Sequence, residues 1–318
     1  MAPSPLHMLA FSLRNPYTIS LDPDSPFRVL YRALRAHSPA VRTLDLSAYA
    51  GNNILITGAT SGCGLELALA LGCIGCHLIL TSRSRDRGEL IKQQVLEEAK
   101  AAGVFTTVDI VPLDLKSPRS IRCIGRLVEE IVPHLDVAIM NAGTYVTSFQ
   151  ICPESGWEEM IQVNALATAA LSLHLRHLLA QSSNGKLLIV SSEAHAWARP
   201  HQHSTKSLLE SIGRSDCKMY PCYQRYHVSK FLSILWTREI CSRDEWRGIR
   251  VAAVSPGYTR SGLFRTFNDT TLARAIERVT CRSPAEGASQ YVFALDSLDS
   301  NWYNGHFWSD GEWRRLVL

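Results

Sequence analysis

Tyr226 and Lys230 lie four residues apart in the segment Tyr226-His227-Val228-Ser229-Lys230. Residues at this spacing share one face of a helix, so both side chains can point into the same cleft. A free phenol has a pKa of about 10 and is a poor acid or base near neutrality. A nearby ammonium favours the phenolate, so we expect Lys230 to lower the pKa of Tyr226. The same spacing also fits an ordinary half-exposed helix face, and the proton-transfer prediction therefore depends on other segments.

A glycine-rich turn, Thr57-Gly58-Ala59-Thr60-Ser61-Gly62-Cys63-Gly64, lies between the apolar run 54–56 and the apolar helical segment 65–71. Gly58 permits a tight turn, Gly62 lets the backbone approach a pyrophosphate, and Gly64 allows close packing of helix on sheet. A glycine triplet alone is more often a plain turn. Here the strand before it and the helix after it predict a dinucleotide-binding loop.

Two further segments follow in order. Asn141-Ala142-Gly143 comes after a strand expected at 137–140, with Asn164 in the next helix, and Ser191-Ser192 ends a strand expected at 186–190. Taken singly, such residues are loop punctuation or strand-end caps. In this order and spacing they indicate one site together with the glycine loop and the Tyr226 segment.

From about residue 50 to about residue 312 this pattern resembles the short-chain dehydrogenase/reductase family. The runs at Ser192–His195 and Tyr226 look most like its retinol-dehydrogenase-like branch. The resemblance implies that Tyr226 is the general acid in reduction and the base in oxidation, and that Lys230 lowers the phenol pKa and bonds the nicotinamide ribose. It also implies that Ser192 polarises the carbonyl and that Asn164 holds a water linking Lys230 to solvent. Met140, Ser255 and Cys63 depart from the commonest family pattern, but no catalytic group is missing.

The resemblance further implies a set of cofactor-binding residues that runs through all these segments. They are Thr57, Gly58, Thr60, Ser61, Gly62, Cys63, Gly64, Ser82, Arg83, Asp114, Leu115, Asn141, Ala142, Gly143, Tyr226, Lys230, Pro256, Gly257 and Thr259.

The segment about 20 residues past the glycine loop predicts NADP(H) rather than NAD(H). An NAD enzyme places an acidic residue there against the ribose 2′-hydroxyl. In this chain the strand expected at 78–81 ends at Ser82 and is followed by Arg83. Arg83 can bind a 2′-phosphate in bidentate fashion, with Arg85 or Arg87 adding positive charge. The alternative is that these arginines form an ordinary solvated loop, and Asp114, at the adenine contact, is neutral on this choice.

Length and composition fit one large α/β domain with a short extension. The chain has 318 residues, a net charge of +4 and nine cysteines without a repeating frame. Scattered basic residues do not imply nucleic acid, and an odd number of cysteines favours reduced thiols inside the cell. Neither a signal peptide nor a membrane-spanning segment is visible, which predicts a soluble, cytoplasmic protein. A homodimer and a homotetramer both stay open.

Strand-like runs alternate with helical periods over residues 51–318, which predicts a Rossmann-type, doubly wound parallel sheet in a single domain. Strands are expected near 53–57, 77–82, 107–111, 136–140, 186–191, 249–254 and 304–308. Helices are expected near 62–74, 87–102, 118–132, 156–181, 224–244 and 284–296. Residues 1–50 form an N-terminal extension. Its basic amphipathic stretch 27–36 either packs on the domain or makes a peripheral membrane contact.

Two long segments, 193–223 and 258–282, each follow a strand end and are expected to form substrate loops. They are rich in rings and aliphatic side chains suited to a mid-sized lipophilic substrate, such as a polyketide, terpenoid, steroid-like or retinoid-like molecule. The apolar candidates are Trp197, Tyr220, Tyr223, Tyr258, Leu263, Phe264 and Phe267. Near the crevice, Arg260 and Arg265 are the basic candidates, so a carboxylate on the substrate stays open. His195, His201 and His203 lack acidic or cysteine partners at ligand spacing, so no metal site is expected. The same fold can host a non-redox cyclase or isomerase, or a regulatory cofactor sensor, and these alternatives remain.

Overall fold

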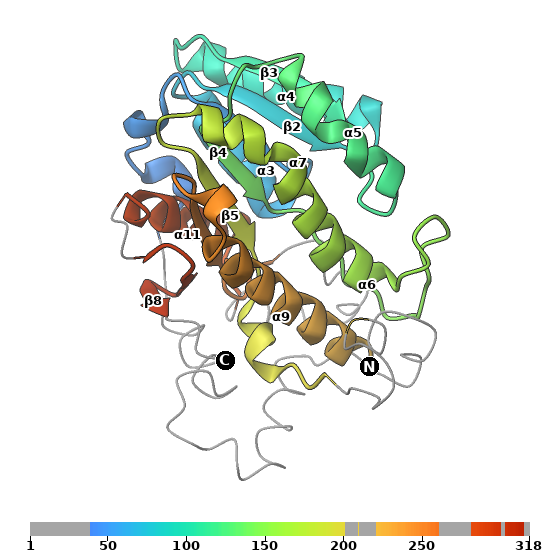
Figure 1. The fold of residues 1–318 in the computed structure, drawn as a ribbon. Coiled ribbons are helices and arrows are strands. Elements are labelled where there is room, and N and C mark those ends of the chain that lie inside the picture. Colours follow the sequence, from blue (N-terminus) through green and yellow to red (C-terminus); the bar gives the residue numbers. More distant parts are fainter. Residues whose placement is uncertain (1–38, 201–208, 210–220, 261–280, 300–302, 315–318) are drawn as a thin grey trace, which may run out of the picture.

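The structure of the chain is a computed structural model that describes residues 39–200, 209, 221–260, 281–299 and 303–314 (Figure 1). Its strands are β1 (Asn53–Ile56), β2 (His77–Ser82), β3 (Thr107–Pro112), β4 (Val137–Met140), β5 (Lys186–Val190), β6 (Arg250–Val254), β7 (Phe307–Ser309) and β8 (Glu312–Arg314). Its α-helices are α3 (Gly62–Gly72), α4 (Arg85–Ala101), α5 (Pro118–Glu129), α6 (Glu159–Ile161), α7 (Ala167–Gln181), α9 (Cys222–Cys241) and α11 (Pro284–Ser297).

The described strands form one sheet in the order β3-β2-β1-β4-β5-β6-β7-β8, in which all neighbours are parallel except β7 and β8. The chain starts the sheet at β1, builds outward to β3, then returns to the other side of β1 at β4. Strand order therefore reverses between β1 and β4, and the carboxyl ends beside this point form the crevice where ligands bind in such sheets. The predicted Rossmann-type doubly wound fold is confirmed.

Helices cover both faces of the sheet, as Figure 1 shows. Ile54 and Ile56 of β1 pack in a core with α3, α4 and α11, whereas Leu55 between them faces a core with α5, α7 and α9. Because successive side chains of a strand point to opposite faces, a strand covered on both sides must be apolar throughout. This requirement explains the continuous apolar runs from which the strands were predicted.

The domain core begins before β1, inside the segment that we assigned to an N-terminal extension. Val41, Leu46 and Tyr49 are buried in the core beneath α3 and α11. The Tyr49 hydroxyl donates a hydrogen bond of 2.5 Å to Asp296 Oδ1, near the end of α11. Residues 41–49 are thus an integral part of the folded domain.

Several sequence-based expectations fall outside the described residues. They concern the amphipathic stretch 27–36, most of the two substrate loops, and the side chains His201, His203, Tyr220, Leu263, Phe264, Arg265 and Phe267. Within the part that the structure describes, no helix combines the length and apolar character needed to cross a membrane.

Candidate active site

The glycine loop leads from β1 into α3 and has the backbone that only glycine adopts readily. Gly58 and Gly62 have φ angles of +67° and +61°, in the left-handed region. A Cβ on Gly64 would lie 2.5 Å from Asn141 Nδ2, so this glycine is required for contact with the turn after β4. We expected Gly64 to serve packing of helix on sheet; its close neighbours are the Asn141 side chain and the Gly58 carbonyl.

Asn141 and Thr57 join the glycine loop to the turn after β4. Asn141 Nδ2 donates to the carbonyl oxygens of Thr57 (2.8 Å) and Gly58 (3.2 Å), and the backbone N–H of Ala142 donates to Thr57 Oγ1 (3.0 Å). The hydroxyl of the buried Tyr291, on α11, donates to Asn141 Oδ1 at 2.9 Å. The Asn141 side chain therefore fixes the backbone of the glycine loop through its hydrogen bonds.

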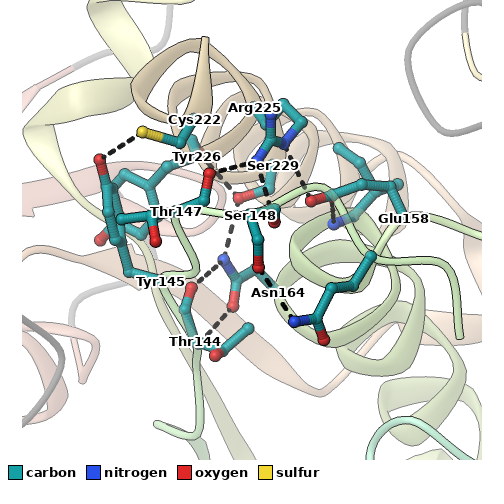
Figure 2. Close-up of polar contacts among 12 residues, drawn as sticks. Thr144, Tyr145, Thr147, Ser148, Glu158, Asn164, Cys222, Arg225, Tyr226 and Ser229 are labelled. Atoms are coloured by element: carbon teal, nitrogen blue, oxygen red, sulfur yellow. Dashed lines mark hydrogen bonds and ion pairs between the residues drawn. The ribbon is translucent and has the colours of Figure 1, made fainter. Parts of the chain in front are cut away.

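Asn164 lies in a π-helical turn, Gln162–Leu166, which sits between α6 and α7. Its side chain brackets the backbone of Thr144, since Oδ1 accepts from the Thr144 N–H (2.8 Å) and Nδ2 donates to the Thr144 carbonyl (2.9 Å). Nδ2 also donates to Ser229 Oγ of α9 at 3.0 Å (Figure 2). A π-helical turn is a frequent feature of functional sites because it re-aims side chains out of the regular ladder.

The two serines after β5 have different surroundings. Ser191 is buried, and its hydroxyl donates to the Lys230 carbonyl at 3.1 Å, which ties β5 to α9. Ser192 is partly exposed and accepts a hydrogen bond from the Ala194 N–H at 3.2 Å. A hydrogen bond from Ser192 also acts on the phenol of Tyr226 and lowers its pKa. Of the pair, Ser192 is therefore the one that reaches Tyr226.

Tyr226 and Lys230 lie on α9, as their spacing predicts, and both are nearly buried. Lys230 Nζ donates to the Val190 carbonyl at 3.0 Å and lies 5.8 Å from the centroid of the Tyr226 ring. Burial lowers the pKa of Lys230 to about 8. Burial raises the pKa of Tyr226 to about 12, although the Ser192 hydrogen bond opposes this shift. The expected lowering of the phenol pKa was wrong here, because desolvation of the phenolate is the largest effect on this group.

The segment after β6 also reaches the crevice. Gly257 has a φ angle of +76°, and Thr259 Oγ1 donates to the carbonyl oxygens of Pro256 and Gly257, both at 3.2 Å. A Cβ on Gly287, in α11, would meet both Cys63 Sγ and Thr259 Oγ1 at 2.8 Å. Thr259 therefore lies against the amino end of α11, beside a residue of the glycine loop.

The residues that we expected at the adenosine end of a cofactor follow β2 and β3. Ser82 is buried and donates to the Ser84 carbonyl at 2.7 Å, whereas Arg83 and Arg87 are exposed. Arg87 Nη2 donates to the Thr60 carbonyl of the glycine loop at 3.2 Å. Its guanidinium therefore connects α4 to that loop.

After β3, Asp114 Oδ1 accepts a hydrogen bond from the Lys116 N–H at 3.0 Å. The Leu115 carbonyl accepts one from Gln162 Nε2 at 2.9 Å. Leu115 is thus linked to the π-helical turn that carries Asn164.

Sequence reasoning missed three features around Tyr226. The Tyr145 ring packs on the Tyr226 ring with centroids 5.3 Å apart, and Arg225 forms a buried ion pair with Glu158. The third is the support that Tyr291 gives to Asn141. All three join residues far apart in sequence, and only the position of Tyr145 just past Asn141-Ala142-Gly143 gave a local hint.

Comparisons with known proteins agree with this geometry. A family model described as short chain dehydrogenase matches residues 52–204. A short chain dehydrogenase of Aspergillus sclerotiorum is 31% identical over 92% of this chain and 83% of its own length. Retinol dehydrogenase 14 of Mus musculus is 31% identical over 84% of this chain and 80% of its own. A solved short chain dehydrogenase of Escherichia coli CFT073, complexed with NADPH, has a TM-score of 0.61 at 23% identity, covering 84% of this chain and 99% of that one.

The chain belongs to the short-chain dehydrogenase/reductase family and resembles its retinol-dehydrogenase-like members. It is accordingly an oxidoreductase of a family that binds a nicotinamide cofactor and acts on CH–OH/C=O groups of small molecules. The glycine loop fits such a cofactor: Ser61, which precedes α3, makes no side-chain capping hydrogen bond, so this side chain does not compete with a phosphate for the first amides of the helix.

Proposed function

We propose that this protein is an NADP(H)-dependent oxidoreductase that interconverts a carbonyl and an alcohol on a mid-sized lipophilic substrate. The observation that carries the proposal is the meeting of Ser192, Tyr226 and Lys230 at the carboxyl end of β5. Lys230 bonds to the last residue of that strand, and Ser192 hydrogen-bonds to Tyr226. A scaffold used only for cyclisation, isomerisation or cofactor sensing has no need of all three groups.

In this proposal the bound nicotinamide supplies the hydride in reduction and accepts it in oxidation. Ser192 donates a hydrogen bond to the substrate oxygen and polarises the carbonyl. Tyr226 then gives its proton to that oxygen as negative charge develops there. A pKa of about 12 keeps the phenol protonated at neutral pH, which is the form that reduction needs. Lys230 binds the nicotinamide ribose, and Asn164 supports the turn that carries Gly143 beside the Lys230 ammonium.

The lipophilic substrate is supported by the side chains near Tyr226. Tyr145, Met160, Ala194 and Tyr226 form one apolar cluster, with Trp197 packed against it. These residues come from the turn after β4, from α6, from the segment after β5 and from α9. The likeness to retinol dehydrogenase 14 points to the same class of substrate, and the short chain dehydrogenases of Aspergillus species fit a role in secondary metabolism.

The central test is Tyr226→Phe. We expect NADPH to bind nearly as tightly as to the wild type, because the ring still packs on Tyr145. Turnover should fall by about 10²–10⁴-fold because the transferable proton is gone. Binding is measured by cofactor fluorescence and turnover by the loss of reduced-nicotinamide absorbance on a panel of ketones. Wild-type turnover in Tyr226→Phe would instead favour a cyclase or an isomerase.

The substrate class is tested separately with a series of ketones that differ only in the length of their apolar part. We expect kcat/KM to rise with length, because each well-buried methylene contributes roughly 1 kcal/mol to binding. An efficiency that is flat with apolar size, or highest for small polar ketones, would rule out a lipophilic pocket while leaving the oxidoreductase assignment in place.

A further inference from the structure

We propose that Arg225 is a positioning residue: together with Glu158, it fixes the first turn of α9, and hence Tyr226, against the segment that follows β4. The inference rests on the proposed role of Tyr226 and adds residues that hold it in place.

Arg225 and Glu158 form an ion pair that is almost closed to water, with exposed fractions of 4% and 0% for the two side chains. Arg225 Nε donates to Glu158 Oε1 at 3.1 Å. Arg225 Nη2 donates to the carbonyl oxygens of Thr147 (3.3 Å) and Ser148 (3.2 Å), as Figure 2 shows. The Arg225 guanidinium therefore connects α9 both to the start of α6 and to the segment that follows β4.

Glu158 extends this connection toward Asn164. It is the residue before α6, and its Oε2 accepts the N–H of Ile161 at 3.0 Å, which caps the helix. The π-helical turn with Asn164 follows directly, and Asn164 bonds to Ser229 of α9 at 3.0 Å. Ser229 Oγ in turn donates to the Tyr226 carbonyl at 2.7 Å. The backbone of Tyr226 is thus held on both sides, by Arg225 just before it and by Ser229 one turn after it.

The ion pair is a poor device for stability alone. Burial raises the pKa of Glu158 despite the nearby guanidinium, so desolvation is the larger effect on the carboxylate. Apolar side chains of similar volume often replace a buried ion pair without loss of stability. Apolar side chains cannot make directional hydrogen bonds. The planar guanidinium of Arg225 bonds to three acceptors on two segments at fixed angles. We therefore assign to the ion pair the role of fixing the position of α9 and Tyr226.

Four variants separate geometry from stability. Arg225→Met removes the tether and leaves a buried carboxylate without its cation. Glu158→Gln/Arg225→Met removes both charges, while the amide oxygen introduced by the first substitution can still cap α6. Arg225→Lys keeps the positive charge but loses the planar set of N–H donors. Lys186→Met is the control, because Lys186 is buried and ion-paired with Asp299 but starts β5 at the opposite end of the strand from the site.

We expect Arg225→Met to lower both Tm and kcat. The double variant should recover much of the Tm, yet its kcat should stay about tenfold to a hundredfold below wild type, with NADPH affinity within about threefold, because small misplacement of a reacting group is costly. Arg225→Lys should restore kcat only in part, and Lys186→Met should lower Tm alone. Amides of residues 222–229 should exchange with deuterium faster in Arg225→Met and in the double variant.

A double variant that recovers both Tm and wild-type kcat would overturn the inference, as would unchanged amide exchange over residues 222–229. Tyr226→Phe is assayed in parallel. If that variant stays active, or if no ketone in the panel is reduced by the wild type, the proposed function fails, and the exchange measurement still decides whether Arg225 holds α9.

Discussion

Burial disfavours the charged forms of Tyr226 and Lys230 alike. The phenol pKa rises to about 12 and the ammonium pKa falls to about 8. Near neutral pH the phenol therefore keeps its proton, while Lys230 is a cation close to the point of losing its own. A buried cation that touches the Val190 carbonyl is held there against its preference for water. Because of this cost, we expect that replacing Lys230 with an uncharged residue stabilises the folded protein even though it removes activity.

We expect Lys230→Met to unfold at higher denaturant concentration than the wild type at pH 7, but with little NADPH affinity or turnover. The folded-state pKa of about 8 lies below the unfolded value of about 10.4, so the destabilising contribution of Lys230 is fully present below pH 8. This contribution is relieved as the pH rises from about 8 to about 10.4. The advantage of Lys230→Met should be roughly 1–3 kcal/mol at pH 7 and should shrink by pH 10. Urea unfolding at both pH values measures it, with Lys100→Met, an exposed lysine of α4, as the control. A Lys230→Met variant that is no more stable than the wild type at pH 7, or whose advantage is the same at both pH values, would contradict the argument.

The exposed arginines after β2 predict a preference for NADPH over NADH. Arg87 already lies against the glycine loop through the Thr60 carbonyl, and Arg83 directly follows the last strand residue. Charge-assisted hydrogen bonds to a 2′-phosphate are typically worth ~1.5–3 kcal/mol. Arg83→Ala should weaken NADPH binding by roughly tenfold or more and leave NADH binding unchanged. Arg87→Ala should weaken NADPH binding more than NADH binding, because it also removes a contact with the glycine loop. Fluorescence titration with both cofactors measures this, and a wild type that binds NADH as tightly as NADPH would refute it.

At the scale of the elements, the strands β1, β4, β5 and β6 could be predicted because each is short and apolar and has a glycine, asparagine or serine within the next two residues. The strands expected from β1 to β6 all form, and the topology then brings Gly58, Asn141, Ser192 and Tyr226 to one edge of the sheet. Parallel strands place their carboxyl ends on one side, so residues more than 160 positions apart meet without any local signal.

Other elements could not be predicted, or were overlooked. The helix expected over 156–181 begins at Glu159 and contains a π-helical turn, whose residues have the same apolar pattern as the helix around it. The ion pair between Glu158 and Arg225 depends on tertiary packing alone. The antiparallel hairpin of β7 and β8 was visible in principle: Asp310 and Gly311 both have positive φ, and Asp-Gly between two short strands is a turn signal.

At the scale of the whole molecule, the first and last parts of the described chain close over the same face of the sheet. Residues 41–49 pack beside α3 and α11, and Arg42 forms ion pairs with Glu66 and Glu98 of the neighbouring helices. The hydroxyl of Tyr49 bonds to Asp296 of α11. Residues 41–49 therefore join α3 to α11, although sequence alone placed them outside the domain.

This packing predicts a sharp difference between two truncations. Removing residues 1–50 takes away Val41, Leu46 and Tyr49, each fully or almost fully buried, whereas removing residues 1–38 leaves all three in place. Burying such a side chain contributes roughly 1.5–3 kcal/mol, so their joint loss approaches the total stability of about 5–15 kcal/mol for a domain. We expect the shorter protein to lose most of its yield of folded protein, or at least about 10 °C of Tm, relative to the protein that starts at residue 39. Thermal unfolding of the two truncations, side by side with the full chain, measures the difference. Equal Tm values for the two truncations would show that residues 39–50 contribute nothing to the stability of the fold.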